Sequence, residues 1–257
     1  MKVFKFGGAS VKNADAVKNV IHILQLHKSE KLIVVISAMG KTTNQLELVV
    51  KALWNRDQAG FLAQIESLHQ FHIDICKGLF SDEHNTIYKE IQSVIDGLKN
   101  RFQAQIPDNY NYEYDQIVSL GEVISTLIVE AYAREAGLMS TWLDARKVVR
   151  TNATFRDAEV DWKRTEELIN AYVTPAFDDH SIIITQGFIG HTPELLTTTL
   201  GREGSDFTAG IFAYCLNAEN VTIWKDVPGM LNADPKYFDN TVKLDKISFH
   251  EAIELSY

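Results

Sequence analysis

The sequence predicts an α/β protein whose central sheet is mostly parallel and covered by helices on both faces. Short runs rich in β-branched and aromatic residues recur along the chain, and each has the length of a buried strand. Longer segments between them carry an apolar residue at every third or fourth position, which is the spacing of an amphipathic helix. Strands that alternate with helices require crossover connections, and these connections build parallel sheets.

Five runs are expected to form the buried strands of this sheet. Val17, Val20, Ile21 and Leu24 recur with helical spacing after the first run, so a helix is expected to connect it to the second. The runs are Lys2–Phe6, Leu32–Ile36, Met139–Leu143, Ser181–Thr185 and Val221–Trp224.

A helical insertion is expected near residues 42–109. This stretch contains no convincing strand, and its apolar residues recur with helical spacing, as at Leu46, Val49 and Leu53. No internal repeat or low-complexity linker interrupts the chain. With 257 residues, the chain has room for one large α/β domain or two small ones.

The composition argues against several classes of partner. Apolar residues at 46% and charged residues at 23% are typical of a globular protein. The net charge of −9 argues against a nucleic-acid partner, because binding to the phosphate backbone relies on a basic face. We expect no membrane partner, since no apolar stretch approaches the ~18 residues of a membrane helix. The N-terminus leaves no room for a signal peptide, so a cytoplasmic protein is expected.

The cysteines and histidines predict neither a disulfide nor a metal site. Cys76 and Cys215 are the two cysteines, and both lie in apolar helical patterns, so we expect buried free thiols in a reducing compartment. The eight histidines show no metal-ligand spacing.

The last segment of the chain begins like a helix that continues further. Ser248 and Glu251 have the spacing of a capping box, yet the chain stops at Tyr257 without a C-cap glycine. A helix of about two turns is marginal alone. We therefore expect that the chain is cut from a longer natural protein.

A glycine-rich stretch, KFGGAS at residues 5–10, follows the first strand. Ligands bind at the carboxyl ends of parallel strands, and glycines there let the backbone approach a phosphate closely. The stretch lacks the GxGxxG spacing of a dinucleotide site, so a tight turn and a phosphate-binding turn both stay open. Lys5 favours the second, because a lysine within an apolar strand must find an anion or reach solvent.

The stretch SAMGKTTN, at residues 37–44, follows the second strand and matches only the end of a P-loop. The first glycine of that motif would fall at Val35. A Gly-Lys-Thr triplet after a strand is more often an ordinary turn that enters a helix, so the P-loop interpretation fails.

The stretch TTLGREGSDFTA, at residues 198–209, gathers Arg202, Ser205 and Asp206 around two glycines just before a helix. A helix N-terminus attracts an anion, and an arginine can hold a carboxylate through two hydrogen bonds. The alternative is that Ser205 or Asp206 only caps the helix, which leaves the arginine and the glycines unexplained.

Two further stretches are ambiguous. IWKDVPGMLNADPK, at residues 223–236, is either a surface turn or, because of its lysines, a loop that contacts phosphate. In SLGE, at residues 119–122, Glu122 points nearly opposite the apolar stripe of its helix. A solvated glutamate is therefore expected, unless a ligand cleft lies on that face.

Taken together, these stretches resemble the catalytic domain of the aspartate kinase family, in the amino-acid kinase superfamily. Six motifs occur in order over essentially the whole chain: KFGGAS, SAMGKTTN, SLGE, TQGFIG, TTLGREGSD and WKDVPGMLNADPK. The resemblance implies a three-layer α/β/α sandwich with eight mostly parallel strands and a catalytic domain over residues 1–257. It implies transfer of the ATP γ-phosphoryl group to the side-chain carboxylate of L-aspartate, with Mg²⁺, as the first step toward lysine, threonine and methionine.

The resemblance also implies roles for individual residues. The catalytic pair would be Lys5 and Asp206, with Asp206 orienting the lysine. Glu122 would take the ammonium group of aspartate, and Arg202 one of its carboxylates. Aspartate would be bound by Thr43, Glu122, Arg202 and Ser205. ATP would be held by Lys5, Gly7, Gly8, Ser10, Ser37, Lys225, Asp226, Leu231 and Lys236.

Several residues depart from the usual pattern of this family. Ala9 replaces Thr, Glu203 replaces Gly, Lys225 replaces Thr, and Leu231 replaces a frequent Tyr. The family also continues into regulatory ACT domains, which we do not expect within residues 1–257, and a homo-oligomer stays open for a full-length protein. Two alternatives remain: a kinase of glutamate or N-acetylglutamate, and a non-catalytic nucleotide-binding module. Arg202 and Glu122 as partners of a carboxylate and an ammonium group favour a free amino acid.

Overall fold

The computed structural model describes residues 1–104, 108–225, 227 and 229–256. The chain divides into two compact units, Met1–Trp224 and Lys225–Tyr257. The single catalytic domain over residues 1–257 therefore stays a prediction, and each unit is described by itself.

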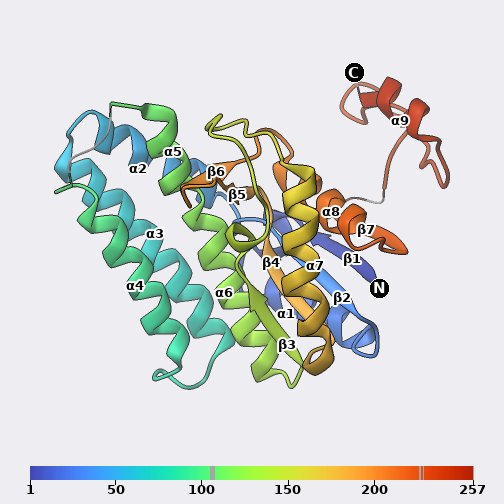
Figure 1. Ribbon diagram of the computed structural model, residues 1–257, viewed down its shortest axis with the longest axis horizontal. Coiled ribbons are helices and arrows are strands. Elements are labelled where there is room, and N and C mark those ends of the chain that lie inside the picture. The colour runs from blue at the N-terminus through green and yellow to red at the C-terminus, as the bar shows by residue number, and fades with distance from the viewer. Residues whose placement is uncertain (105–107, 226, 228, 257) are drawn as a thin grey trace. The chain divides into compact units, whose positions relative to one another are not determined.

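The first unit is built on a central sheet of five parallel strands in the order β3-β4-β2-β1-β7 (Figure 1). All five predicted strands are present, and none is displaced by more than one residue at either end, which confirms the α/β fold class. Instead of the eight strands that the resemblance implies, the described residues form this sheet and a separate antiparallel pair, β5 (Ile189–His191) with β6 (Thr197–Thr199). The central strands are β1 (Lys2–Phe6), β2 (Leu32–Ile36), β3 (Ser140–Leu143), β4 (Ile182–Gln186) and β7 (Asn220–Trp224).

Helices cover both faces of the sheet, because alternate residues of each strand enter two different cores. Phe4 and Val34 join a core with α1 (Ala14–Leu26) and α6 (Leu120–Glu135). Their neighbours Val3 and Val35 join a second core with α7 (Trp162–Asp179) and α8 (Gly204–Cys215). The strands β1, β2 and β4 are buried on both faces, as their near-continuous apolar sequences predict. The expectation of a buried strand at Val221–Trp224 was wrong, because β7 is an edge strand of this sheet and its residues are exposed or half-buried. The three-layer arrangement is confirmed.

The part of the predicted insertion 42–109 that the structure describes consists of helices joined by turns, with no strand. Each of its later helices begins at a residue whose side chain accepts a hydrogen bond from the first turn: Asp57 from Gly60 N (2.9 Å) and Asn85 from Ile87 N (3.1 Å). Such residues are typical N-caps. The helices of this region are α2 (Thr42–Trp54), α3 (Gln58–Leu79) and α4 (Thr86–Asn100), and α5 (Tyr110–Val118) follows.

One helical stretch, Tyr110–Glu135, is long and apolar enough to cross a membrane by length and composition alone. The expectation that no stretch reaches this length was therefore wrong. However, 72% of its apolar window is buried inside the protein, as in the core helix of a soluble protein. Cys76 and Cys215 are buried free thiols, as predicted.

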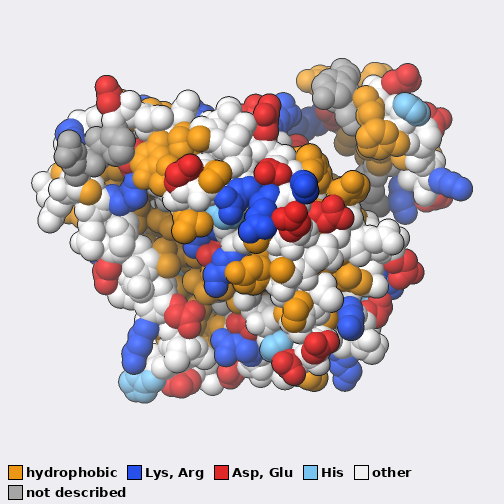
Figure 2. Space-filling model, viewed as in Figure 1, with side chains coloured by type: hydrophobic (Ala, Val, Ile, Leu, Met, Phe, Trp, Pro, Cys, Tyr) orange, Lys and Arg blue, Asp and Glu red, His pale blue; other side chains and the backbone are white. Residues whose placement is uncertain are grey.

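Charged side chains of both signs are interspersed on the face of the first unit seen in Figure 2, where a group of Lys and Arg side chains lies near the middle. The expectation that nucleic acid is not a partner stays a prediction.

The second unit contains one helix among its described residues, α9 (Phe249–Ser256). The predicted capping box is present: Ser248 N donates to Glu251 Oε2 (2.9 Å), and Glu251 N donates to Ser248 Oγ (3.3 Å). Leu231 and Lys243 form an isolated antiparallel bridge.

Candidate active site

The loops that follow β1, β2 and β4 are joined by hydrogen bonds at the carboxyl ends of these strands. Ser37 N donates to the Phe6 carbonyl oxygen (3.1 Å), and Gly187 N donates to the Ile36 carbonyl oxygen (3.0 Å). Ligands of open parallel sheets bind at this edge. These bonds hold the ends of the three strands side by side, so the loops that follow them form a shared floor for a site.

A cavity of about 220 Å³ lies at this edge. Elements far apart in the sequence contribute to it: β1, the loop after β2, the first turn of α2, the start of α6, and the N-terminus of α8. Its lining residues are Lys5, Ser37, Thr43, Glu122, Phe188, Gly201, Glu203, Gly204, Ser205 and Asp206. The cavity thus brings together six residues that the sequence singles out: Lys5, Ser37, Thr43, Glu122, Ser205 and Asp206.

Lys5 and Asp206 form an ion pair in this cavity, with 2.6 Å between Lys5 Nζ and Asp206 Oδ1. Lys5 lies between the apolar residues Val35 and Ile223 of the neighbouring strands and is only 7% exposed. A buried ammonium group in such surroundings needs an anion. Asp206 supplies it from the first turn of α8. Of the two outcomes expected for Lys5, an anion or solvent, the structure shows the anion.

Glu122 is buried, so the expectation of a solvated glutamate was wrong. Its side chain accepts one hydrogen bond, from Ala38 N to Oε1 (3.3 Å), while Oε2 has no hydrogen-bond partner among the described residues. Helix α6 packs against neighbours around most of its circumference. Its first turn is therefore buried also on the face opposite its apolar residues, where Glu122 lies. Burial raises the pKa of this carboxyl to about 8.

The glycine-rich turn after Lys5 is tightly packed against the loop after β2. Gly40 N donates to the Gly8 carbonyl oxygen (3.0 Å), and a Cβ at Gly8 would lie 2.6 Å from the Ala38 carbonyl oxygen. A Cβ at Gly7 would lie 3.6 Å from Lys5 Nζ, so the Gly7 backbone is close to the ammonium group. Gly7, Gly8 and Ser10 do not line the cavity itself. Their phosphate contacts stay a prediction.

The loop before α8 has an unusual backbone. Glu203, at the start of the helix, has a φ of 55°, and Gly201 has a φ of 74°. This left-handed region favours glycine, in agreement with the glycine that the resemblance implies at position 203. Arg202 between them is exposed and does not line the cavity, so its contact with a carboxylate stays a prediction.

Sequence reasoning missed the lining residue Phe188, although its motif, TQGFIG, was part of the resemblance. Phe188 has a φ of 73°, and its N donates to Thr208 Oγ1 (2.9 Å) in α8. The preceding Gly187 allows α8 to approach, because a Cβ there would lie 2.5 Å from Ser205 Cβ. A glycine at a strand end was the available signal. Gly201 and Gly204 were also missed as lining residues.

The remaining predicted nucleotide contacts fall outside the first unit. Lys225, Leu231 and Lys236 belong to the second unit, and Asp226 lies outside the described residues. Their roles stay predictions.

The described residues hold no group of three or more His, Cys, Asp or Glu side chains that could bind a metal ion. Asp206 and Glu203 are two carboxylates on the cavity wall besides Glu122. One or two carboxylates together with substrate phosphates are the usual ligands of Mg²⁺. The donor set therefore fits an ion that arrives with a phosphate ligand.

A sequence model of the amino acid kinase family matches residues 1–257, and the chain belongs to this family. Within it, the chain is similar to the lysine-sensitive aspartokinase 3 of Escherichia coli strain K12, with 34% identity over 254 residues. The match covers 99% of this chain and 55% of that protein. Aspartokinase 1 of Arabidopsis thaliana, a chloroplastic protein, is 30% identical over 261 residues, which is 99% of this chain and 45% of that protein.

Solved structures support the same relationship. A crystal structure of E. coli aspartokinase III in complex with aspartate and ADP matches with a TM-score of 0.91 and 34% identity, covering 100% of this chain and 56% of that one. The aspartate kinase of Clostridium acetobutylicum matches with a TM-score of 0.80 and 27% identity, covering 100% and 55%. The chain spans about half the length of these relatives.

Proposed function

We propose that this chain carries the catalytic site of an aspartate kinase, which transfers the γ-phosphoryl group of ATP to the side-chain carboxylate of L-aspartate. The main support is one cavity that holds both a buried lysine paired with Asp206 and a buried glutamate, one oxygen of which has no hydrogen-bond partner in the part of the chain that the structure describes. The positive charge of the lysine suits a phosphate, and the carboxylate of the glutamate suits an ammonium group. The names of the relatives, and the aspartate and ADP bound to one of them, support the same assignment.

On this proposal, Lys5 binds the phosphates of ATP from the end of β1. Asp206 keeps the ammonium group in place through the 2.6 Å ion pair. The N-terminus of α8 lines the same cavity, and its partial positive charge favours an anion there. Gly7, Gly8, Ser10 and Ser37 would surround the phosphates, and Lys225, Asp226, Leu231 and Lys236 would contact the rest of the nucleotide.

The amino acid would bind on the Glu122 side of the cavity. Oε2 of Glu122 is the acceptor available for the substrate ammonium group. Thr43 and Ser205 line the cavity with hydroxyl groups that can bind a carboxylate, and Arg202 would hold the α-carboxylate. This arrangement favours an acceptor with a free ammonium group over an acylated amino acid.

The reaction needs no general base. The side-chain carboxyl of free aspartate, with an ordinary pKa of ~3.9, is already ionised at neutral pH. Its oxygen forms the new bond to the γ-phosphorus while the bond to the ADP oxygen breaks. Charge spreads over the phosphoryl oxygens in the loose transition state. Lys5 and backbone N–H groups stabilise that charge, so positioning and electrostatics supply the catalysis.

Mg²⁺ would enter with ATP, and Asp206 and Glu203 are the carboxylates of this chain that could hold it. When bound, the ion supplies charge neutralisation on the phosphates. We place the reaction in the cytoplasm, as the first step toward lysine, threonine and methionine.

Hydroxylamine trapping tests the proposal. An acyl phosphate reacts with hydroxylamine to give a hydroxamate, so ATP, hydroxylamine and L-aspartate should yield aspartyl hydroxamate together with ADP. Glutamate and N-acetylglutamate run in parallel should yield far less. A hydroxamate preferentially from N-acetylglutamate would indicate a different kinase, and no ADP release with any acid would contradict the proposal.

A further inference from the structure

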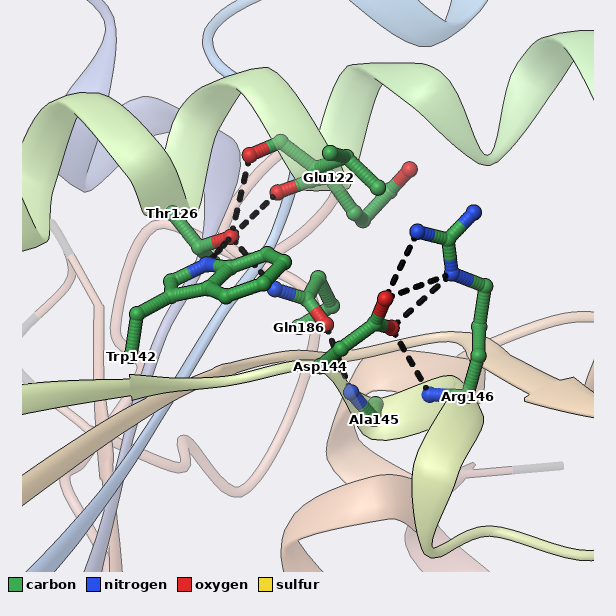
Figure 3. Close-up of polar contacts among 8 residues, drawn as sticks. Glu122, Thr126, Trp142, Asp144, Ala145, Arg146 and Gln186 are labelled. Atoms are coloured by element: carbon green, nitrogen blue, oxygen red, sulfur yellow. Dashed lines mark hydrogen bonds and ion pairs between the residues drawn. The ribbon is translucent and has the colours of Figure 1, made fainter. Parts of the chain in front are cut away.

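A hydrogen-bond network centred on the buried side chain of Thr126 lies one helical turn after Glu122 in α6 and is not part of the cavity lining (Figure 3). Thr126 Oγ1 donates to the Glu122 carbonyl oxygen (2.9 Å) and to the Val123 carbonyl oxygen (3.1 Å). The same oxygen accepts from Gln186 Nε2 (2.7 Å) and from Trp142 Nε1 (2.9 Å). A helical threonine often donates to its own helix, but here the hydroxyl also joins α6 to two strands.

Gln186 connects this network to the floor of the cavity. It is the last residue of β4, is fully buried, and accepts from Ala145 N through Oε1 (2.7 Å). The next residue, Gly187, donates to the carbonyl oxygen of Ile36 at the end of β2, and the one after it, Phe188, lines the cavity. One amide side chain therefore joins the second turn of α6, the end of β4 and the segment after β3.

The network matters because the Glu122 carboxylate is weakly held by its own contacts. Only one of its oxygens is hydrogen-bonded, over 3.3 Å, and the other has no hydrogen-bond partner among the described residues. Its position is therefore set mainly by the backbone of the first turn of α6. Thr126 holds the carbonyl oxygen of that same residue.

We propose that Thr126 and Gln186 are positioning residues, which hold Glu122 where it meets the ammonium group of the substrate. This inference rests on the proposed function. Neither side chain touches the reacting atoms, so both act on binding of the amino acid rather than on phosphoryl transfer. Loss of the network is expected to raise KM for aspartate about tenfold, because the buried donor Gln186 and the half-buried donor Trp142 lose their acceptor and the turn that carries Glu122 shifts.

The test replaces Thr126→Val, which keeps the volume and removes the hydroxyl. The expected result is a KM for aspartate raised about tenfold, with kcat and KM for ATP changed less than about threefold. Thr126→Ser keeps the hydroxyl and should behave like the unmodified chain. Trp142→Phe removes one donor but leaves the bonds to Gln186 and Glu122, so KM for aspartate should change little.

A merely structural role gives a different result. It would lower the folded fraction and hence the apparent kcat, while KM for aspartate stays unchanged, and that outcome would overturn the inference. If Thr126→Val does not fold, Gln186→Glu carries the same test, because it keeps the acceptor for Ala145 N and loses the amide donor to Thr126. If the unmodified chain shows no turnover with aspartate, the proposed function fails and the inference fails with it. Turnover with an unchanged KM in the variants overturns the inference alone.

Discussion

Binding of aspartate is expected to release close to one proton at neutral pH. Burial raises the pKa of Glu122 from 4.5 to about 8, so at pH 7 roughly nine of ten molecules carry this group protonated. An ammonium group bound at Oε2 favours the ionised carboxylate. Binding at pH 7 therefore expels about 0.9 proton, and the release falls to about 0.1 at pH 9, where the carboxyl is already ionised.

The same protonation sets the pH dependence of affinity and stability. The dissociation constant for aspartate should fall about tenfold from pH 6 to pH 7 and level off above pH 8, because only ionised Glu122 pairs with the ammonium group.

The stability of the chain without ligand changes in the opposite direction: it decreases as the pH rises, whereas the affinity for aspartate increases. The folded chain binds the extra proton between pH 4.5 and 8, so stability falls as pH rises through this window. At 1.36 kcal/mol per pKa unit, the full loss is about 5 kcal/mol.

Isothermal titration calorimetry of aspartate in buffers with different ionisation enthalpies measures the released protons. Glu122→Gln is the matched control, because it keeps the side-chain size and cannot titrate. It should release almost no proton, bind aspartate about 100-fold more weakly, and lose the fall in stability between pH 4.5 and 8. Tight binding without proton release, or equal release by the variant, would refute the role of Glu122.

Three further predictions concern the other parts of the cavity. Lys5→Ala should lower kcat about 10²–10³-fold in steady-state assays with little change in KM for aspartate, and an unchanged kcat would contradict its role. The Glu203→Gly variant should have a free energy of unfolding in urea about 1 kcal/mol higher than the Glu203→Ala variant, because position 203 has a φ of 55°, which glycine adopts without strain. Equal free energies of unfolding would show that the backbone there is not strained. Gly187→Ala should lower kcat/KM for aspartate at least about tenfold, because its Cβ would collide with Ser205. Gly210→Ala is the control and should leave kcat/KM unchanged, because nothing lies within 4 Å of a Cβ at that position. Equal kcat/KM values for the Gly187→Ala and Gly210→Ala variants would contradict the expected collision with Ser205.

The positions of the central strands could be predicted closely because each is a short run of apolar or β-branched residues, and β1, β2 and β4 are buried on both faces. The exposure of β7 could not be predicted, because its place at the edge of the sheet decides it. The antiparallel pair β5 and β6 could not. Its strands are three residues long, and one of them, Thr197–Thr199, carries no apolar pattern. The pairing depends on distant contacts, such as the hydrogen bond from Gln116 Nε2 to the Thr197 carbonyl oxygen (2.7 Å).

The candidate site shows the same division. Lys5 could be predicted as a site residue from the sequence, because a lysine within an apolar strand needs an anion. Burial of Glu122 could not be predicted from its helix alone, because the packing of α6 against other elements decides it. The left-handed backbone of Glu203 was also hidden, since glutamate has no preference for it and only the family's usual glycine pointed to it.

The most direct measurement is a crystal structure of this chain with ADP and aspartate. The account predicts Lys5 Nζ within about 3 Å of a phosphate oxygen and the aspartate ammonium group at Glu122 Oε2. Phosphates bound away from Lys5, with its side chain still paired only to Asp206, would contradict it.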